Sequence, residues 1–320
     1  MKQSLSPKEL AQAIGVSESS LKRWTDSGRV RASRTIGGHR RIHLQEALRF
    51  IRESRLPVVR PELLGLPELG DAEQISEDVS HAGEVMLSLL SRGELTRARG
   101  LALNLYLSGH SVAWVCDGPL SHAMSEIGKI WETQQDGIFT EHRATEMCTQ
   151  IVSQLRVVLE PSGELEQESR PVAVGGCPAG DAGALSSMMA AATLAECGYS
   201  TTNLGGNTPV DALLEALSRH EPRLVFLACP HQGHLPKGAA METLSERMAE
   251  LGGCVVVGGY GAEREFRASL PNVFLHRSMS ELSAFARGLL AVPRLDASGP
   301  AAVNGHSLNG HGQGGGVSAS

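Results

Sequence analysis

One turn in the second half of the chain has the composition of a ligand-binding loop but few reactive side chains. The sequence GCPAGDAGAL (residues 176–185) follows an apolar run and precedes a stretch of Ser, Met and Ala that is typical of a helix. Small residues between a strand and a helix let a ligand approach the backbone closely. Asp181 and Cys177 carry the reactive groups there, so a carboxylate and a thiol are the chemistry that this turn can supply.

A second group of candidate residues lies near the middle of the chain. Trp131 precedes Glu141 by ten residues and His142 by eleven, and Gly137 stands between them. We expect Trp131 to end one helix and Glu141 to begin the next, so that an aromatic ring, a carboxylate and an imidazole meet at one end of a bundle. The alternative is structural: Trp131 anchors the core, and Glu141 interacts with the helix dipole.

A third group is defined by charge. Residues 1–60 contain 13 Lys and Arg against 5 Asp and Glu, whereas the other 260 residues contain 16 against 30. A basic module is therefore joined to an acidic body. The expected partner of the basic module is an anion such as double-stranded DNA.

The basic module has the pattern of a winged helix-turn-helix. Ser6 and Glu9 resemble a capping box for a helix over 7–14, and Ser17 caps a second helix. Gly37 and Gly38 predict a hairpin turn, followed by a helix from residue 43. The side chains expected to face DNA are Ser19, Ser20, Lys22, Arg23, Arg31, Arg34, His39, Arg40 and Arg41. The alternative is that these charges form a solvated face.

The remaining elements divide the chain into domains. We expect a DNA-binding domain over 1–58, a proline-containing linker over 59–74 that lets it move, a four-helix bundle over 75–162, an α/β domain over 168–292 and a disordered tail over 293–320. The α/β part contains five short apolar strands separated by helices, at 171–176, 200–205, 223–229, 254–259 and 272–276. This alternation predicts a doubly wound parallel sheet, whose ligands bind at the carboxyl ends of the strands.

Several classes of protein are disfavoured by what the sequence lacks. Six scattered cysteines without a C-x-x-C pair argue against a zinc site and a disulfide scaffold. No nucleotide-binding glycine signature is present. We expect no membrane span and a cytoplasmic location, because no apolar stretch is long enough and the N-terminus has no signal-peptide core.

About the first 55 residues, SPKELAQAIGVSESSLKRWTDSGRVRASRTIGGHRRI above all, resemble the DNA-binding module of MerR-type regulators. The resemblance implies that Ser19, Ser20, Lys22 and Arg23 face the major groove and that Arg40 and Arg41 belong to the wing. It also implies binding as a dimer or larger oligomer across paired half-sites. Trp24 is expected in the core.

The body of the chain, through about residue 292, resembles the cobalamin-binding regulators of the CarH and LitR type. The resemblance rests on Trp131 with Glu141 and His142, followed by GCPAGD, LGGNTP and VVGGYG. It implies a Rossmann-like cobalamin-binding fold and adenosylcobalamin as cofactor. In that family light breaks the cobalt–carbon bond, a histidine of the cap takes the vacated position, and the repressing oligomer comes apart.

The resemblance also assigns roles to residues of this chain. Trp131 would cover the upper face of the corrin, with Glu141 and His142 close by and His142 a candidate upper cobalt ligand. The nucleotide tail of the cofactor would be accommodated by Gly205, Asn207, Thr208, Gly258 and Gly259.

The sequence departs from the family at the lower cobalt ligand. The family motif D-x-H-x-x-G appears here with Asp181 in place, but Gly183 stands at the histidine position and Ser186 at the glycine position. Glycine cannot ligate cobalt. Three outcomes stay open: cobalamin binds base-on or with water below, His231 or His234 replaces the lost ligand, or the cleft holds another ligand or none. Exposed loop histidines, and a thiolate at Cys177 or Cys229 for haem iron, are the further alternatives.

Together these patterns predict a DNA-binding transcriptional repressor with a light-responsive sensor of the cobalamin-binding type, and no catalysis of covalent chemistry. Two alternatives remain at this stage. The same regulator has a sensor that no longer binds cobalamin, or the chain is the corrinoid carrier of a methyltransferase, which uses a similar bundle and α/β pair.

Overall fold

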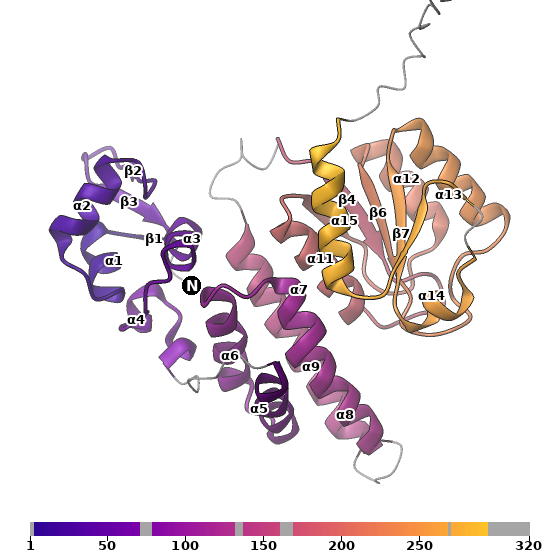
Figure 1. The fold of residues 1–320 in the computed structure, drawn as a ribbon, viewed down its shortest axis with the longest axis horizontal. Coiled ribbons are helices and arrows are strands. Elements are labelled where there is room, and N and C mark those ends of the chain that lie inside the picture. The colour runs from indigo at the N-terminus through magenta and orange to yellow at the C-terminus, as the bar shows by residue number, and fades with distance from the viewer. Residues whose placement is uncertain (1–2, 71–78, 132–136, 161–168, 268–269, 294–320) are drawn as a thin grey trace, which may run out of the picture.

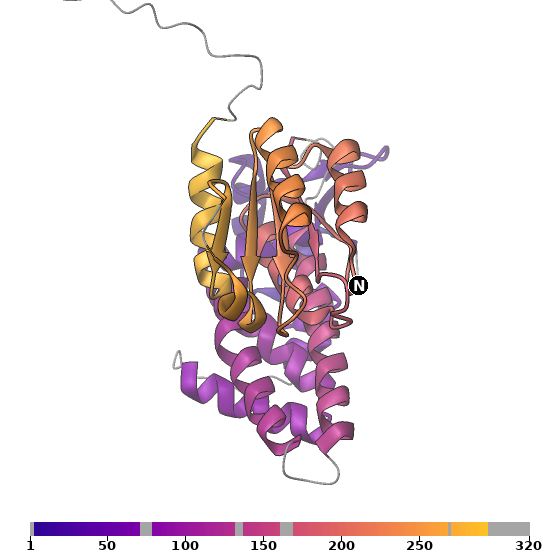
Figure 2. The same cartoon turned by 90° about the vertical axis from the view of Figure 1, so that its right-hand side faces the viewer.

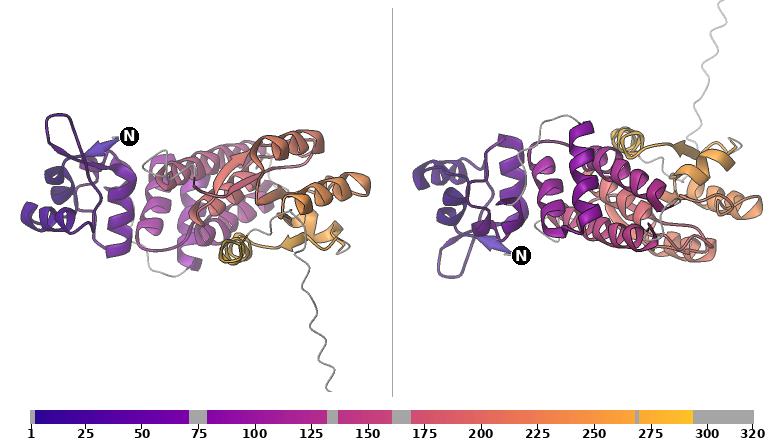
Figure 3. Two further views of the ribbon diagram at one scale, coloured as in Figure 1. Left: turned by 90° about the horizontal axis from the view of Figure 1, so that it is seen from above. Right: turned by 90° about the horizontal axis from the view of Figure 1, so that it is seen from below.

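The computed structural model describes residues 3–70, 79–131, 137–160, 169–267 and 270–293, and these form three domains in a row. Figure 1 and Figure 3 show a small N-terminal domain, a helical domain in the middle and a helix-covered sheet at the far end. A membrane span would need a longer and more apolar helix than any that these residues form.

The N-terminal domain is the predicted winged helix-turn-helix. Its elements are β1 (Ser4–Leu5), α1 (Pro7–Ala13), α2 (Glu18–Asp26), β2 (Ser33–Arg34), β3 (Arg40–His43) and α3 (Leu44–Ser54). The capping box of α1 is present: Ser6 and Glu9 exchange backbone and side-chain hydrogen bonds. Gly38 adopts a positive φ of 78° in the turn between β2 and β3. β1 adds an antiparallel strand beside β3 that the sequence did not indicate.

The structure differs from the predicted linker over 59–74. The chain folds there into α4 (Pro61–Leu64) and a 3₁₀ turn, η1 (Pro67–Gly70). α4 contacts α1, and η1 contacts α6 of the helical domain. The reason is apolar burial, since three leucines of this segment are in the core: Leu64, Leu66 and Leu69. Residues 59–70 are therefore a packed connection, and residues 71–74 lie outside the described part.

The middle domain is the predicted four-helix bundle. Its helices are α5 (Val79–Arg92), α6 (Leu95–Leu107), a composite of α7 (Val112–Val115), η2 (Cys116–Leu120) and α8 (Ser121–Trp131), and α9 (Gly137–Leu159). The composite helix contains the π-helical turn η2, because Pro119 has no N–H to donate to the regular ladder.

The C-terminal domain is a five-stranded, all-parallel sheet in the order β5-β4-β6-β7-β8, as predicted. Its strands are β4 (Val172–Gly176), β5 (Ser200–Asn203), β6 (Leu224–Ala228), β7 (Cys254–Gly258) and β8 (Val273–His276). Its helices are α11 (Leu185–Glu196), α12 (Val210–His220), α13 (Ala239–Glu250), α14 (Tyr260–Glu265) and α15 (Met279–Ala291). The short α14 was not expected from the sequence.

Helices cover both faces of this sheet (Figure 2). α11 and α15 pack together on one face over Phe226 and Val256, and α12 and α13 pack together on the other over Val225 and Val255. The chain leaves β4 toward one face and the neighbouring β6 toward the other. A crevice for ligands is expected between the loops that follow these two strands.

The three domains share apolar contacts. One continuous core cluster runs from the N-terminal domain through the bundle to Met189 and Ala192 on α11. α9 packs along α11, and α3 contacts both α6 and α9. The bundle is therefore the element that holds the N-terminal domain and the sheet domain relative to each other.

A buried carboxylate stabilises the N-terminal domain. Glu46 on α3 accepts the backbone N–H of Arg31 at 2.7 Å and the Nε–H of Arg49 at 2.8 Å. Burial by itself raises the pKa of Glu46, but the hydrogen bonds and positive charges of Arg49 and Arg31 outweigh it, and the net pKa lies below 4.5. A carboxyl group with a lowered folded-state pKa stabilises the fold above its unfolded pKa, and this contribution is lost as the pH falls through the folded pKa.

We therefore expect Glu46→Gln to lower the free energy of unfolding at pH 7 by about 1–3 kcal/mol, because two guanidinium groups lose their partner. The difference from the wild type should shrink as the pH falls below about 4.5, where the wild-type carboxylate also becomes protonated. Urea unfolding at pH 7, 5 and 3 measures both effects. Glu53→Gln is the control, since Glu53 is exposed and pairs with the same Arg49; an equal loss in both variants would contradict the prediction.

Candidate functional site

The first candidate site is the exposed face of the N-terminal domain. Ser17 caps α2, and its hydroxyl lies 2.9 Å from the hydroxyls of both Ser19 and Ser20. Lys22 and Arg23 follow on the same helix and are exposed. Hydroxyl groups at the start of α2 and two cations further along the same helix form an exposed surface that suits phosphate and base-edge acceptors.

The wing supplies a second exposed basic segment. Arg34 and Arg41 lie on paired strands, are exposed, and have no side-chain hydrogen bond or ion pair with any described residue. His39 is also exposed, close to the turn. The sequence reasoning missed Ile36, which is fully exposed at the tip. Its signal was a lone large apolar residue beside the turn glycines, and such a residue can wedge between base steps in a groove.

Two of the expected DNA contacts have other partners in this structure. Arg40 is half-buried, forms an ion pair with Asp26 and donates to the Thr25 hydroxyl at 3.2 Å. Arg31 is bonded to Glu46 through its backbone N–H and its guanidinium. Both arginines therefore fasten the wing segment to α2 and α3. Their role in the described structure is to position the wing, in contrast to the free arginines at 34 and 41.

The second candidate site is formed by the two loops that follow β4 and β6. Asp181, in the loop after β4, has a buried side chain that accepts the Gly183 N–H at 3.2 Å. His231, in the loop after β6, places its Nδ1 3.2 Å from both carboxylate oxygens of Asp181, while 70% of its side chain is exposed. His234 does not reach the carboxylate in this way; its ring lies against Gly180. The fold thus brings together residues separated by 50 positions in the sequence.

Three residues expected to hold a cofactor tail, Gly205, Asn207 and Thr208, connect two loops in this structure. Asn207 donates its N–H to the Asp181 carbonyl oxygen at 2.6 Å and accepts the Gly180 N–H at 2.8 Å. Thr208 is buried, and its hydroxyl donates to the Gly205 carbonyl oxygen at 3.2 Å. These contacts hold the loop after β5 against the loop after β4, which contains Asp181.

Gly258 and Gly259, by contrast, line a cavity of about 220 Å³. It lies at the carboxyl ends of β6 and β7, between the sheet and the helices α11 and α15, and its other walls include Ala190, Phe226 and Leu282. An apolar cavity with a few polar groups at its edge is the usual form of a small-molecule site.

His276, at the end of β8, is a further polar group of this cavity. Its Nε2 is buried and has no hydrogen-bond partner among the described residues. Burial lowers the pKa of His276, with the charge of Glu281 acting in the opposite direction. The sequence reasoning missed His276, although its position at the end of a predicted strand was a signal. His276 thus borders the cavity while its Nε2 is enclosed by protein atoms, so the imidazole adds a neutral, polarisable wall to the site.

The helical domain closes one side of the cavity. Asp117, in η2, accepts the backbone N–H groups of Met279 and Ser280, each at 2.8 Å, and also the Ser280 hydroxyl at 2.6 Å. The carboxylate therefore caps the N-terminus of α15, where the helix dipole favours a negative charge. Asp117 and Ser121 both line the cavity, so its wall is built by two domains.

The cap residues differ in part from the expectation, because α9 begins at Gly137 and Glu141 lies four residues inside it. Trp131 ends α8, and its side chain lies outside the described part of the structure. Glu141 and His142 lie in the first turns of α9, with His142 Nε2 3.5 Å from a Glu141 oxygen. The Glu141 carboxylate also accepts the Thr145 hydroxyl at 2.9 Å, and 77% of the His142 side chain is exposed.

The cysteine alternative loses support. Cys177 and Cys229 are both fully buried. Burial raises the pKa of Cys229 to about 12, so that residue is a neutral thiol at physiological pH. A neutral, enclosed thiol is a poor ligand for haem iron, which takes the thiolate.

A comparison with known protein families supports the assignment of the N-terminal domain as a helix-turn-helix. Residues 4–55 match the family model described as a helix-turn-helix domain. No curated protein matches the chain.

Three solved structures share weak overall similarity. The monomethylamine corrinoid protein of Methanosarcina barkeri aligns with a TM-score of 0.46 at 13% identity, over 65% of this chain and 98% of its own. The methanol:cobalamin methyltransferase complex MtaBC of the same organism aligns with a TM-score of 0.34 at 13% identity, over 76% and 89%. A cobalamin-binding protein from Desulfitobacterium hafniense DCB-2 aligns with a TM-score of 0.34 at 13% identity, over 67% and 99%.

Proposed function

We propose that this protein is a DNA-binding transcriptional regulator whose bundle and α/β domain form a cobalamin-binding sensor. The observation that carries the DNA-binding part is the helix-turn-helix over residues 4–55, with a cationic α2 and a free, basic wing on one domain. A regulator of this kind performs no covalent chemistry on a substrate. It acts as a repressor that responds to light through its cofactor.

The residues of the α/β domain fit a cobalamin. The cavity beside Gly258 and Gly259 has mainly apolar walls, with His276 at its edge, and suits a bicyclic aromatic group such as the base of the nucleotide tail. The crevice between the Asp181 and His231 loops opens at the same edge of the sheet. Bound adenosylcobalamin would supply a light-sensitive cobalt–carbon bond.

The remaining roles belong to residues of this chain. Gly258 and Gly259 leave room for the tail, and Asp117 holds the bundle against α15 at the cavity wall. His142 is an exposed imidazole on the cap helix and would be able to hold the cofactor's cobalt, with Glu141 beside it. A change of self-association on illumination is then the route by which the sensor acts on the DNA-binding domains.

The experiment that tests this function uses the full-length protein in darkness with adenosylcobalamin. Absorbance after removal of free ligand reports binding, and light scattering with a DNA mobility assay reports oligomer size and DNA affinity before and after green light. We expect retained corrinoid, and a decrease in both size and DNA affinity after illumination. Protein that binds DNA but stays colourless and unchanged by light would leave a regulator without a cobalamin sensor.

The cavity itself is tested by filling it. Ala190 is a buried residue of α11 that lines the cavity, so Ala190→Leu should place additional carbon atoms in that space. We expect cobalamin affinity to fall by at least about tenfold, because the tail group and the new side chain compete for one volume, and the far-ultraviolet circular dichroism to stay unchanged.

The matched control is Ala239→Leu, the same substitution at an exposed position of α13. It should leave the affinity for cobalamin unchanged. Equal affinity in the wild type and both variants would place the tail outside this cavity.

A further inference from the structure

Asp181 lacks the histidine two residues later that the family motif would place beside it, and the imidazole of His231, from another loop, lies against its carboxylate. Its Nδ1 lies 3.2 Å from Oδ1 and 3.2 Å from Oδ2 of Asp181. The carboxylate is 1% exposed and the imidazole 70% exposed. A buried carboxylate therefore holds an outward-facing histidine by one of its two ring nitrogens.

The fold explains how a histidine from another loop reaches this aspartate. Asp181 follows β4 and His231 follows β6, and these neighbouring strands are paired in parallel with their carboxyl ends at the same edge. α11 and α13 leave toward opposite faces, so the two loops border the crevice that ligands occupy in such sheets. The Asp181–His231 contact joins these two loops.

The orientation of the imidazole is that of a metal ligand. A histidine that binds metal through one nitrogen almost always donates its other N–H to a carboxylate or carbonyl group, which fixes the ring and raises its basicity. Here Nδ1 faces Asp181, which leaves Nε2 for a ligand. Among the described residues no group of three or more His, Cys, Asp and Glu side chains could hold a metal ion. A single imidazole suits a metal that brings its other ligands with it, as cobalt does in a corrinoid.

We propose that His231 supplies the lower axial nitrogen to the cobalt of a bound corrinoid and that Asp181 is its positioning residue. This inference rests on the proposed function. Gly183 stands where the family motif has a ligating histidine, and His231 would supply that nitrogen from the loop after the neighbouring strand. The base of the cofactor then remains free to enter the cavity beside His276.

Electron paramagnetic resonance of cob(II)alamin bound to the full-length protein tests the assignment. The protein is produced with all histidine nitrogens as nitrogen-15. A histidine ligand then splits each cobalt line in two, whereas the cofactor's own nitrogen-14 base splits it in three and a water ligand leaves it unsplit. We expect the twofold pattern; a threefold or unsplit spectrum overturns the proposal.

Variants identify the histidine. His231→Ala should abolish the twofold pattern, and His234→Ala, the matched control on the same loop, should keep it. Asp181→Asn should keep the histidine but weaken corrinoid binding by about 10–100-fold, as expected for the partner of a metal-bound imidazole. A twofold pattern that survives in His231→Ala refutes the assignment. If the assignment is wrong but the proposed function holds, the protein still retains cob(II)alamin and Ala190→Leu still weakens its binding. If the proposed function fails, no corrinoid is retained at all.

Discussion

Replacing Lys22 and Arg23 together with alanine should weaken DNA binding by the full-length protein on the order of 100-fold at low salt. Both side chains are exposed on α2 and follow the hydroxyl cluster of Ser17, Ser19 and Ser20 along the chain. If both cations contact phosphates, their loss removes two released counterions. The slope of log affinity against log salt concentration should then become shallower by about 2.

A mixed-sequence duplex is the appropriate probe, because phosphate contacts do not require knowledge of the operator. Fluorescence anisotropy over a range of salt concentrations gives affinity and slope together. Arg219→Ala provides the control: Arg219 is an exposed cation of the α/β domain that pairs with Glu215. A double variant that keeps the wild-type salt slope would show that α2 does not face the phosphates.

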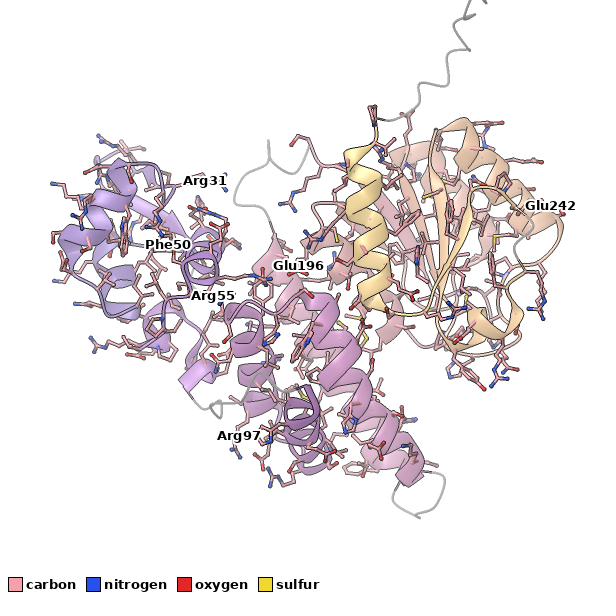
Figure 4. The ribbon with its side chains drawn as sticks, in the orientation of Figure 1. Arg31, Phe50, Arg55, Arg97, Glu196 and Glu242 are labelled. Atoms are coloured by element: carbon pink, nitrogen blue, oxygen red, sulfur yellow. The ribbon has the colours of Figure 1, made fainter. Side chains whose placement is uncertain are left out.

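The second large effect is expected at the junction of the three domains, where Figure 4 labels Glu196. Glu196, on α11, forms an ion pair with Arg52 of α3 at 3.1 Å and accepts the N–H of Val112 at the start of α7 at 2.9 Å. The Arg52 guanidinium also lies 4.0 Å from the ring centre of Tyr106 on α6. One carboxylate therefore contacts all three domains, beside a polar cavity of about 360 Å³.

We expect Glu196→Ala to lower the free energy of unfolding by about 2–3 kcal/mol. The carboxylate is 8% exposed and Arg52 22%, so removal leaves a mostly buried cation and an N–H group without their acceptor. Urea unfolding should also separate into more than one transition, because the N-terminal domain loses part of its attachment to the body.

A double-mutant cycle with Arg52→Ala isolates the ion pair from the hydrogen bond to Val112. Glu250→Ala is the comparison, since Glu250 pairs with Arg247 where both are more than half exposed, and its loss should cost less than about 1 kcal/mol. If Glu196→Ala unfolds in one transition with wild-type stability, Glu196 does not couple the domains.

The secondary structure could be predicted from local patterns because the signals were local. The capping box of Ser6 and Glu9, the helix cap at Ser17 and the apolar runs of the five strands each act within a few residues. Prediction was poorest where local signals conflicted with packing. The prolines at 61 and 67 indicated a mobile linker, but each lies in the first turn of a short helical segment, where proline is tolerated, and the adjoining leucines are buried.

In the candidate sites, too, local features could be predicted from the sequence and contacts between distant residues could not. Exposure of Lys22 and Arg23 followed from the helical period of α2, which needs no tertiary information. The partners of Arg40 could not be predicted in this way, because Asp26 comes near Arg40 only when the wing folds back on α2. The cavity at His276 was equally hidden, since its walls come from α11, β6, β7 and α15 and from the bundle.

The sequence by itself determined the order of the domains, the type of sheet, the cationic face of α2 and the absence of a histidine at position 183, because each depends on residue type and local spacing. Only the tertiary structure decided that His231 meets Asp181, that His276 borders a cavity, and that Glu196 connects three domains. The physical reason is that these contacts join residues far apart in the chain, and their geometry is set by strand order and by the packing of α9 on α11.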